Sequence, residues 1–204
     1  LGINQLDTIL GYSFGGHLVY LWATEFPDMM KRVVSIAGAL DRWDVLKEKV
    51  ELIEKSFSDC RNWNNGHFYS MDYSEITKAL IKYRVNVLKH YGFGDYLLHA
   101  KNDEETIECI IHEAAKGWSS YFDPNSLIIL RRANIGSSAY KKASNIKVPI
   151  LKVLAKTDKV INVNEGYETI KYLKSLNIDC SLIELETPFG HYGPMCDSWE
   201  WSGN

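Results

Sequence analysis

The sequence predicts an α/β fold with a mostly parallel sheet and a helical insertion. Short apolar runs rich in β-branched residues occur near both ends of the chain and alternate with helical patterns, which is typical of strand–helix–strand units. Residues 41–145 show helical periods instead. We therefore assign residues 1–40 and 146–204 to the core that holds the sheet. Residues 41–145 are assigned to a helical cap, with a separate helical domain of no catalytic role as the alternative.

The first strand is expected at residues 6–10, directly before Gly11-Tyr12-Ser13-Phe14-Gly15-Gly16. This sequence matches G-x-S-x-G, the pattern of a nucleophile elbow, in which a serine lies on a sharp turn between a strand and a helix. We expect that a Cβ at Gly11 or Gly15 would clash, because the turn brings backbone close to backbone there. The following helix is apolar on almost every side, so we expect it to be buried against the sheet.

The remaining elements follow from the same periodicities. Buried strands are expected at residues 33–39, 149–155 and 179–185. An amphipathic helix is expected at 164–176, with Tyr167, Ile170 and Leu173 facing inward. Within the insertion, helices are predicted around residues 45–57, 76–88 and 104–115, and the Asn- and Gly-rich residues 62–67 are predicted to form a loop.

Composition excludes several classes of function. Lys and Arg total 23 against 26 Asp and Glu, so no basic excess indicates a nucleic-acid partner. No apolar run reaches the roughly 18 residues that a membrane span needs. Four cysteines without a C-x-x-C pair favour reduced thiols and a cytoplasmic location, with a Cys180–Cys196 bridge as the alternative. We expect no metal and no bound cofactor.

Three residues at the ends of successive predicted strands suggest nucleophilic catalysis. Ser13, Asp158 and His191 follow one another in the order serine, acid, histidine, which is the order of α/β-hydrolases. A serine needs an adjacent base, and the base needs an orienting carboxylate. The alternatives are that Asp158 caps a turn and that His191 is an ordinary loop histidine. The other histidines are weaker candidates: His17, His67, His90, His99 and His112.

These residues predict a covalent mechanism. His191 accepts the proton of Ser13, Ser13 attacks an acyl carbonyl, and Asp158 orients the imidazole. The backbone N–H of Phe14 is the expected oxyanion donor. The second donor normally comes from a loop after an earlier strand. The sequence shows no earlier strand, so we expect the chain to be part of something longer, with the missing strands on a preceding segment or on a second chain.

Further motifs resemble the homoserine O-acetyltransferase family of α/β-hydrolase-fold acyltransferases. They are the elbow with the helix that follows it, Trp63-Asn64-Asn65-Gly66, Phe122-Asp123-Pro124-Asn125-Ser126-Leu127 with Arg132-Ala133, Thr157-Asp158, and Pro188-Phe189-Gly190-His191. The resemblance implies acyl transfer from acetyl-CoA through an acyl-Ser13, a role in methionine biosynthesis and a homodimer packed through the cap. It also implies an N-terminal region with the first strands, before the position of Leu1.

Two differences from the family concern the acceptor. Tyr192 stands where members commonly carry an aspartate that binds the substrate amine, and Ser58-Asp59-Cys60-Arg61 does not reproduce the family's pattern of an arginine and an Asp-Pro. Arg131, Arg132 and Tyr192 are candidate substrate-binding residues, and either arginine is alternatively a surface charge. Three hypotheses therefore remain: an acyltransferase with a homoserine-like acceptor, an esterase or thioesterase on the same triad, and an inactive truncated fragment.

Overall fold

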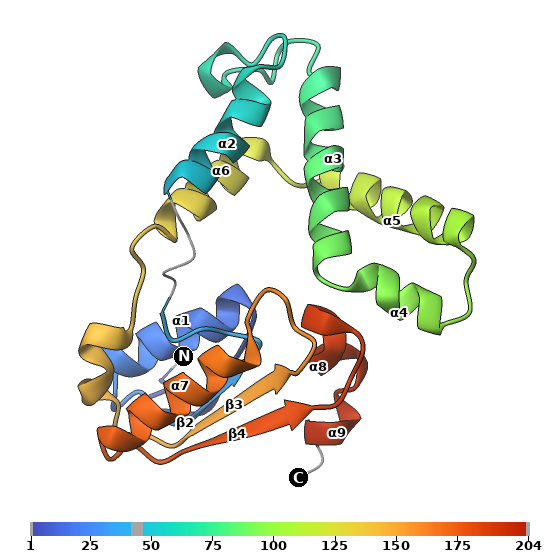
Figure 1. The fold of residues 1–204 in the computed structure, drawn as a ribbon. Coiled ribbons are helices and arrows are strands. Elements are labelled where there is room, and N and C mark those ends of the chain that lie inside the picture. The colour runs from blue at the N-terminus through green and yellow to red at the C-terminus, as the bar shows by residue number, and fades with distance from the viewer. Residues whose placement is uncertain (1, 42–46, 203–204) are drawn as a thin grey trace. The chain divides into compact units, whose positions relative to one another are not determined.

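The computed structural model describes residues 2–41 and 47–202, and these form two compact units (Figure 1). The sheet unit comprises Leu1–Arg42 and Ser138–Asn204, and the helical unit comprises Trp43–Ser137. Residues 138–145, which the sequence assigns to the cap, lie in the sheet unit instead. The reason is that Ala139 and Ala143 are completely buried in its core beside helix α1 (Phe14–Glu25).

A parallel sheet of four strands is the centre of the sheet unit. Its strand order is β1 (Leu6–Tyr12), β2 (Met30–Ile36), β3 (Ile150–Ala155) and β4 (Cys180–Leu185). Helix α1, the short helix η2 (Tyr140–Asn145) and helix α7 (Val163–Ser175) share one core cluster with residues of the sheet. The remaining elements of the unit are η3 (Gly190–Tyr192), α8 (Gly193–Cys196) and α9 (Trp199–Ser202). The predicted α/β architecture is therefore confirmed.

One sequence prediction about helix burial is confirmed and one is wrong in part. Helix α1 is buried against the sheet as predicted, since it packs on β1 and β2 and its Tyr20 and Ala23 are 0% exposed. Its opposite side is open, where Trp22 is 44% exposed. On α7, Tyr167 points outward, is 45% exposed and donates a hydrogen bond to Glu184 at 2.5 Å. The prediction is confirmed for Leu173, which is buried, and for Ile170, which packs against the same core, and Thr169 is buried as well.

Among its described residues, the helical unit contains the three predicted helices, two further α-helices and one short helix within the predicted loop 62–67. It comprises α2 (Lys47–Ser58), η1 (Asn64–Gly66), α3 (Ser74–His90), α4 (Phe93–His99), α5 (Glu104–Ser119) and α6 (Pro124–Ala133). Helix α3 packs on α5, and α2 packs on α6 (Figure 1). Asp103 begins α5 by accepting a hydrogen bond from the N–H of Thr106 at 2.8 Å, as expected of an N-cap residue. The unit has its own core, which includes Phe57, Ile76 and Leu127.

No helix among the described residues is both long and apolar enough to cross a membrane. The cysteines Cys60, Cys109, Cys180 and Cys196 are all free thiols, so the alternative of a Cys180–Cys196 bridge is wrong. Burial raises the pKa of the Cys180 thiol.

Candidate active site

Ser13 lies on the tight turn between β1 and α1. Its backbone has φ 56° and ψ −113°, a left-handed combination that costs about 1–3 kcal/mol for a residue with a side chain. Neighbouring hydrogen bonds hold the turn in this conformation. The N–H of Ser13 donates to the carbonyl of Ile36 at 2.8 Å, and the N–H of His17 donates to the carbonyl of Ser13 at 3.1 Å. The predicted strand–turn–helix around the serine is thus present.

Of the two glycines in the elbow pattern, Gly11 has the expected role and Gly15 does not. A Cβ on Gly11 would lie 2.1 Å from the carbonyl oxygen of Gly15, so the prediction for Gly11 is confirmed. A Cβ on Gly15 would meet nothing within 4 Å, so the prediction for Gly15 is wrong. The second close approach involves Gly16, where a Cβ would lie 2.8 Å from the Cα of Gly38. This contact fixes the first turn of α1 against the loop that follows β2.

Ser13, His191 and Asp158 form a continuous hydrogen-bonded chain. The distance from His191 Nε2 to Ser13 Oγ is 2.7 Å, and that from His191 Nδ1 to Asp158 Oδ2 is 2.8 Å. Because a carboxylate only accepts, Nδ1–H is the donor, which leaves Nε2 to accept the proton of the serine hydroxyl. Asp158 and His191 are 3% and 1% exposed. The structure brings the three predicted residues together.

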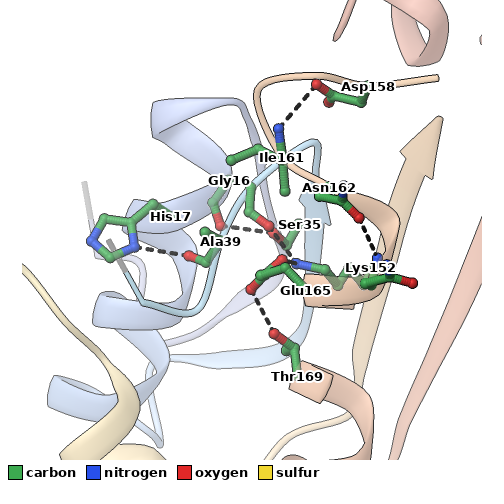
Figure 2. Close-up of polar contacts among 12 residues, drawn as sticks. Gly16, His17, Ser35, Ala39, Lys152, Asp158, Ile161, Asn162, Glu165 and Thr169 are labelled. Atoms are coloured by element: carbon green, nitrogen blue, oxygen red, sulfur yellow. Dashed lines mark hydrogen bonds and ion pairs between the residues drawn. The ribbon is translucent and has the colours of Figure 1, made fainter. Parts of the chain in front are cut away.

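The backbone of the next loop holds the carboxylate of Asp158. Its Oδ1 accepts hydrogen bonds from the N–H groups of Val160 at 2.7 Å and Ile161 at 3.0 Å. Figure 2 draws the contact with Ile161 at the N-terminal end of α7. Asp158 therefore both caps this turn and contacts His191, so the two interpretations of the residue hold together.

Two residues that were not predicted from the sequence hold His191 in position. The hydroxyl of Tyr12 donates to the backbone carbonyl of His191, and its ring lies 5.4 Å from the imidazole, centroid to centroid. Thr157 Oγ1 donates to the carbonyl of Thr187 at 2.6 Å and accepts from the N–H of Gly190 at 3.1 Å. Tyr12 occupies a variable position of the elbow pattern, so the motif gave no signal for it.

Phe14, the predicted oxyanion donor, is the first residue of α1. The first N–H groups of a helix have no partner within the helix and lie at the positive end of its dipole. The position suits an anion, and the donor role stays a prediction. Tyr192 follows His191 in η3 and is partly buried.

The motifs of the helical unit contact one another. Asn125 donates from Nδ2 to the carbonyl of Gly66 at 2.9 Å. A Cβ on Gly66, whose φ is +89°, would lie 2.6 Å from Asn125 Oδ1. Arg131 donates to the hydroxyl of Tyr83 at 2.6 Å, and Arg132 forms two hydrogen bonds with Glu54 at 2.6 and 2.8 Å.

Both candidate arginines therefore have protein partners in the helical unit. A groove of about 550 Å³ lies beside the Glu54–Arg132 pair, with Trp63 and Asn125 also in its lining. A substrate-binding role of either arginine stays a prediction. Among residues 2–41 and 47–202, no group of His, Cys, Asp and Glu side chains is arranged to hold a metal ion.

The chain has the α/β-hydrolase fold, as its superposition on solved structures shows. Esterase E22 superposes with a TM-score of 0.81 at 22% identity, covering 98% of this chain and 60% of that one. A homoserine O-acetyltransferase from Bacillus anthracis superposes with a TM-score of 0.78 at 16% identity, covering 96% and 57%. At these identities the superpositions show the fold alone.

The sequence relatives share a single enzyme name, whereas the structural neighbours do not. The homoserine O-acetyltransferase of Methanohalophilus mahii is 27% identical over 203 residues, which is 94% of this chain and 42% of that protein. The enzyme of the same name from Haemophilus influenzae is 25% identical over 97% of this chain and 60% of its own length. The chain thus resembles homoserine O-acetyltransferases, as its motifs predict, and spans about half the length of these relatives. No family model matches it.

Proposed function

We propose that this chain carries the catalytic residues of a serine acyltransferase or hydrolase that works through an acyl-Ser13 intermediate. The hydrogen-bonded chain from Ser13 through His191 to Asp158 is the observation that carries the proposal. A serine hydroxyl becomes a useful nucleophile only when an adjacent base removes its proton. His191 has the right geometry for this transfer, since its Nε2 lies 2.7 Å from the hydroxyl.

In the first half-reaction, Ser13 Oγ forms a bond to the acyl carbon while its proton moves to His191 Nε2. The negative charge that develops on the carbonyl oxygen is stabilised by the N–H of Phe14. Asp158 stabilises the imidazolium through its hydrogen bond to Nδ1–H. The bond to the leaving group then breaks, and the leaving group takes the proton from His191.

In the second half-reaction, an acceptor hydroxyl gives its proton to His191 and attacks the acyl-Ser13. The ester bond to Ser13 breaks, and Ser13 recovers the proton. We propose acetyl-CoA as the acyl donor and a small homoserine-like alcohol as the acceptor. This finer assignment is supported by the names of the sequence relatives. Acetyl-CoA is then a substrate, and no further cofactor is needed.

Hydrolysis is the second candidate function. Water replaces the alcohol, and the protein is then an esterase or thioesterase on the same three residues. The observation that favours it is Tyr192 next to His191, since the aspartate that commonly binds the amine of homoserine is absent at that position.

Release of CoA from acetyl-CoA, measured with and without L-homoserine, separates the two functions. An acyltransferase releases CoA faster when homoserine is present, and mass spectrometry then finds O-acetylhomoserine. Equal release in both samples contradicts the homoserine assignment, and cleavage of nitrophenyl acetate supports hydrolysis. The Ser13→Ala variant is the control. If neither substrate is turned over and Ser13 forms no adduct, the inactive-fragment hypothesis holds.

Dimerisation through the helical unit stays a prediction that sedimentation equilibrium tests.

A further inference from the structure

A lysine is completely buried in the sheet unit. Lys152 lies in the middle of β3, and its side chain is 0% exposed. Its ammonium group forms an ion pair with Glu165 Oε2 at 3.2 Å, donates to the carbonyl of Gly38, and lies 5.6 Å from the centre of the Tyr20 ring. Burial of a lysine is costly unless the charge is paired and hydrogen-bonded. The catalytic steps proposed above do not use this residue.

The contact with Gly38 connects Lys152 to the elbow. Gly38 lies in the loop after β2, and its backbone packs directly on Gly16 in the first turn of α1. Two more hydrogen bonds join the same parts. Ser35 Oγ donates to the carbonyl of Gly16 at 2.8 Å, and His17 Nδ1 donates to the carbonyl of Ala39 at 2.8 Å. The loop and the start of α1, which carries Ser13 at its cap, are therefore one hydrogen-bonded assembly (Figure 2).

The contact with Glu165 connects Lys152 to the loop of the acid. Glu165 lies in the first turn of α7, and its Oε1 accepts from Thr169 at 2.7 Å. The segment just before this turn holds Asp158 through the N–H of Ile161. Figure 2 draws the contact of Glu165 with Thr169 and that of Ile161 with Asp158. Lys152 thus contacts both the assembly that carries Ser13 and the helix that begins beside Asp158.

We propose that Lys152 and Glu165 are positioning residues that keep Ser13 and Asp158 in register on either side of His191. The inference rests on the proposed function, because it assigns this buried pair a role in the same site. Neither side chain touches the reacting atoms. Proton transfer from Ser13 depends on the distance to His191, and a misplacement of about 1 Å costs roughly 100-fold in rate.

The test compares four variants with the wild-type protein. Lys152→Met removes the charge and both contacts but keeps a linear side chain. Glu165→Ala removes the partner at a position that is 34% exposed, where loss of folding is less of a concern. Glu165→Gln keeps an oxygen that accepts from the ammonium group. Lys142→Met is the matched control, since Lys142 also pairs with a glutamate, Glu25 of α1, but both side chains are largely exposed.

Two quantities are measured below the thermal midpoint of every variant. The first is the rate at which a fluorophosphonate probe labels Ser13. The second is the low-field NMR resonance of the His191 Nδ1 proton in its hydrogen bond to Asp158. We expect labelling to fall roughly 10- to 100-fold in Lys152→Met and Glu165→Ala, with a displaced resonance. Glu165→Gln and Lys142→Met should stay within about twofold of the wild-type rate.

Wild-type labelling and an unchanged resonance in a folded Lys152→Met or Glu165→Ala variant overturn the proposal. If Lys152→Met does not fold, Glu165→Ala decides the outcome in the same way. If the wild-type protein is not labelled, the proposed function fails. The resonance of the His191 proton then still tests the positioning role, because it requires no turnover.

Discussion

The buried ion pairs of the sheet unit and the exposed ion pairs of the helical unit lie in different surroundings. In the sheet unit, His191–Asp158 and Lys152–Glu165 include side chains that are 0% exposed. In the helical unit, Arg132 pairs with Glu54 although 61% of the arginine side chain is exposed. Lys89 and Glu108, at 2.7 Å, are 45% and 62% exposed. The buried pairs hold loops beside Ser13, whereas the exposed pairs join helix surfaces.

Burial changes what a charged pair contributes. Removing one partner of a buried pair leaves an uncompensated charge and costs about 3–5 kcal/mol. An exposed pair is screened by water and contributes about 0.2–1 kcal/mol. We therefore expect substitutions in the buried pairs of the sheet unit to impair catalysis and stability, while substitutions in the exposed pairs of the helical unit have small effects on both.

The largest expected difference concerns histidine. His191→Gln removes the base and should lower the rate of acyl transfer or ester hydrolysis by roughly 10⁶-fold, as removal of such a base does in serine enzymes. His112→Gln in α5 is the matched control, because that side chain is 60% exposed, and its rate should equal that of the wild type. Initial rates with acetyl-CoA and nitrophenyl acetate measure both. A His191→Gln enzyme of wild-type activity contradicts the mechanism.

The next difference concerns lysine and stability. Lys152→Met should lower the free energy of unfolding of the sheet unit by about 3–5 kcal/mol, because Glu165 and the Gly38 carbonyl lose their buried partner. Lys89→Met should lower that of the helical unit by at most about 1 kcal/mol. Denaturant unfolding followed by circular dichroism measures the two changes. Similar losses in both variants would remove the contrast between the units.

Within the elbow itself, replacement of the two motif glycines by alanine should have different effects on stability. Gly11→Ala places a Cβ against the backbone of Gly15 and should destabilise the protein by about 1–3 kcal/mol. Gly15→Ala places its Cβ in open space within a helix and should be neutral or stabilising by up to about 1 kcal/mol. Thermal unfolding of the two variants gives the comparison, and equal destabilisation shows that the close approach at Gly11 is not decisive.

The smallest expected effect is the pH dependence of the Glu54–Arg132 pair. The hydrogen bond from Arg132 holds the pKa of Glu54 below its usual range. A lowered pKa in the folded state adds stability above the pKa of the unfolded chain, about 4.3. This stability is lost as the pH falls through the lower folded-state value. Glu54→Gln should therefore cost less than about 1 kcal/mol at neutral pH and nothing in strong acid.

Unfolding curves of the wild type and of Glu54→Gln at neutral and strongly acidic pH measure this effect. A difference that grows on acidification contradicts the assigned direction of the shift.

Much of the fold was predictable because its signals are local. The strands are short β-branched runs, and the helices of the insertion follow from their apolar periods. The candidate active site was predictable for a related reason. The ends of parallel strands meet at one edge of a sheet, so Ser13, Asp158 and His191 could be grouped without knowledge of the packing.

What could not be predicted depends on contacts between distant segments. Lys152 lies within an apolar run, and only the fold brings Gly38 and Glu165 to its ammonium group. The prediction for Gly15 was wrong and the close approach of Gly16 was missed, because the sequence does not show which glycine faces Gly38. The helical period predicts that Tyr167 faces inward, because the period alone does not reveal the hydrogen bond from its hydroxyl to Glu184.

Covalent modification of Ser13 tests the central claim most directly. The protein is incubated with acetyl-CoA or with a fluorophosphonate, and intact mass and peptide mapping locate the adduct. We predict a single adduct on the peptide that contains Ser13, its absence in Ser13→Ala, and much slower formation in Asp158→Asn. An adduct that persists in Ser13→Ala, or a wild-type protein that forms none, would contradict the assignment of Ser13 as the nucleophile.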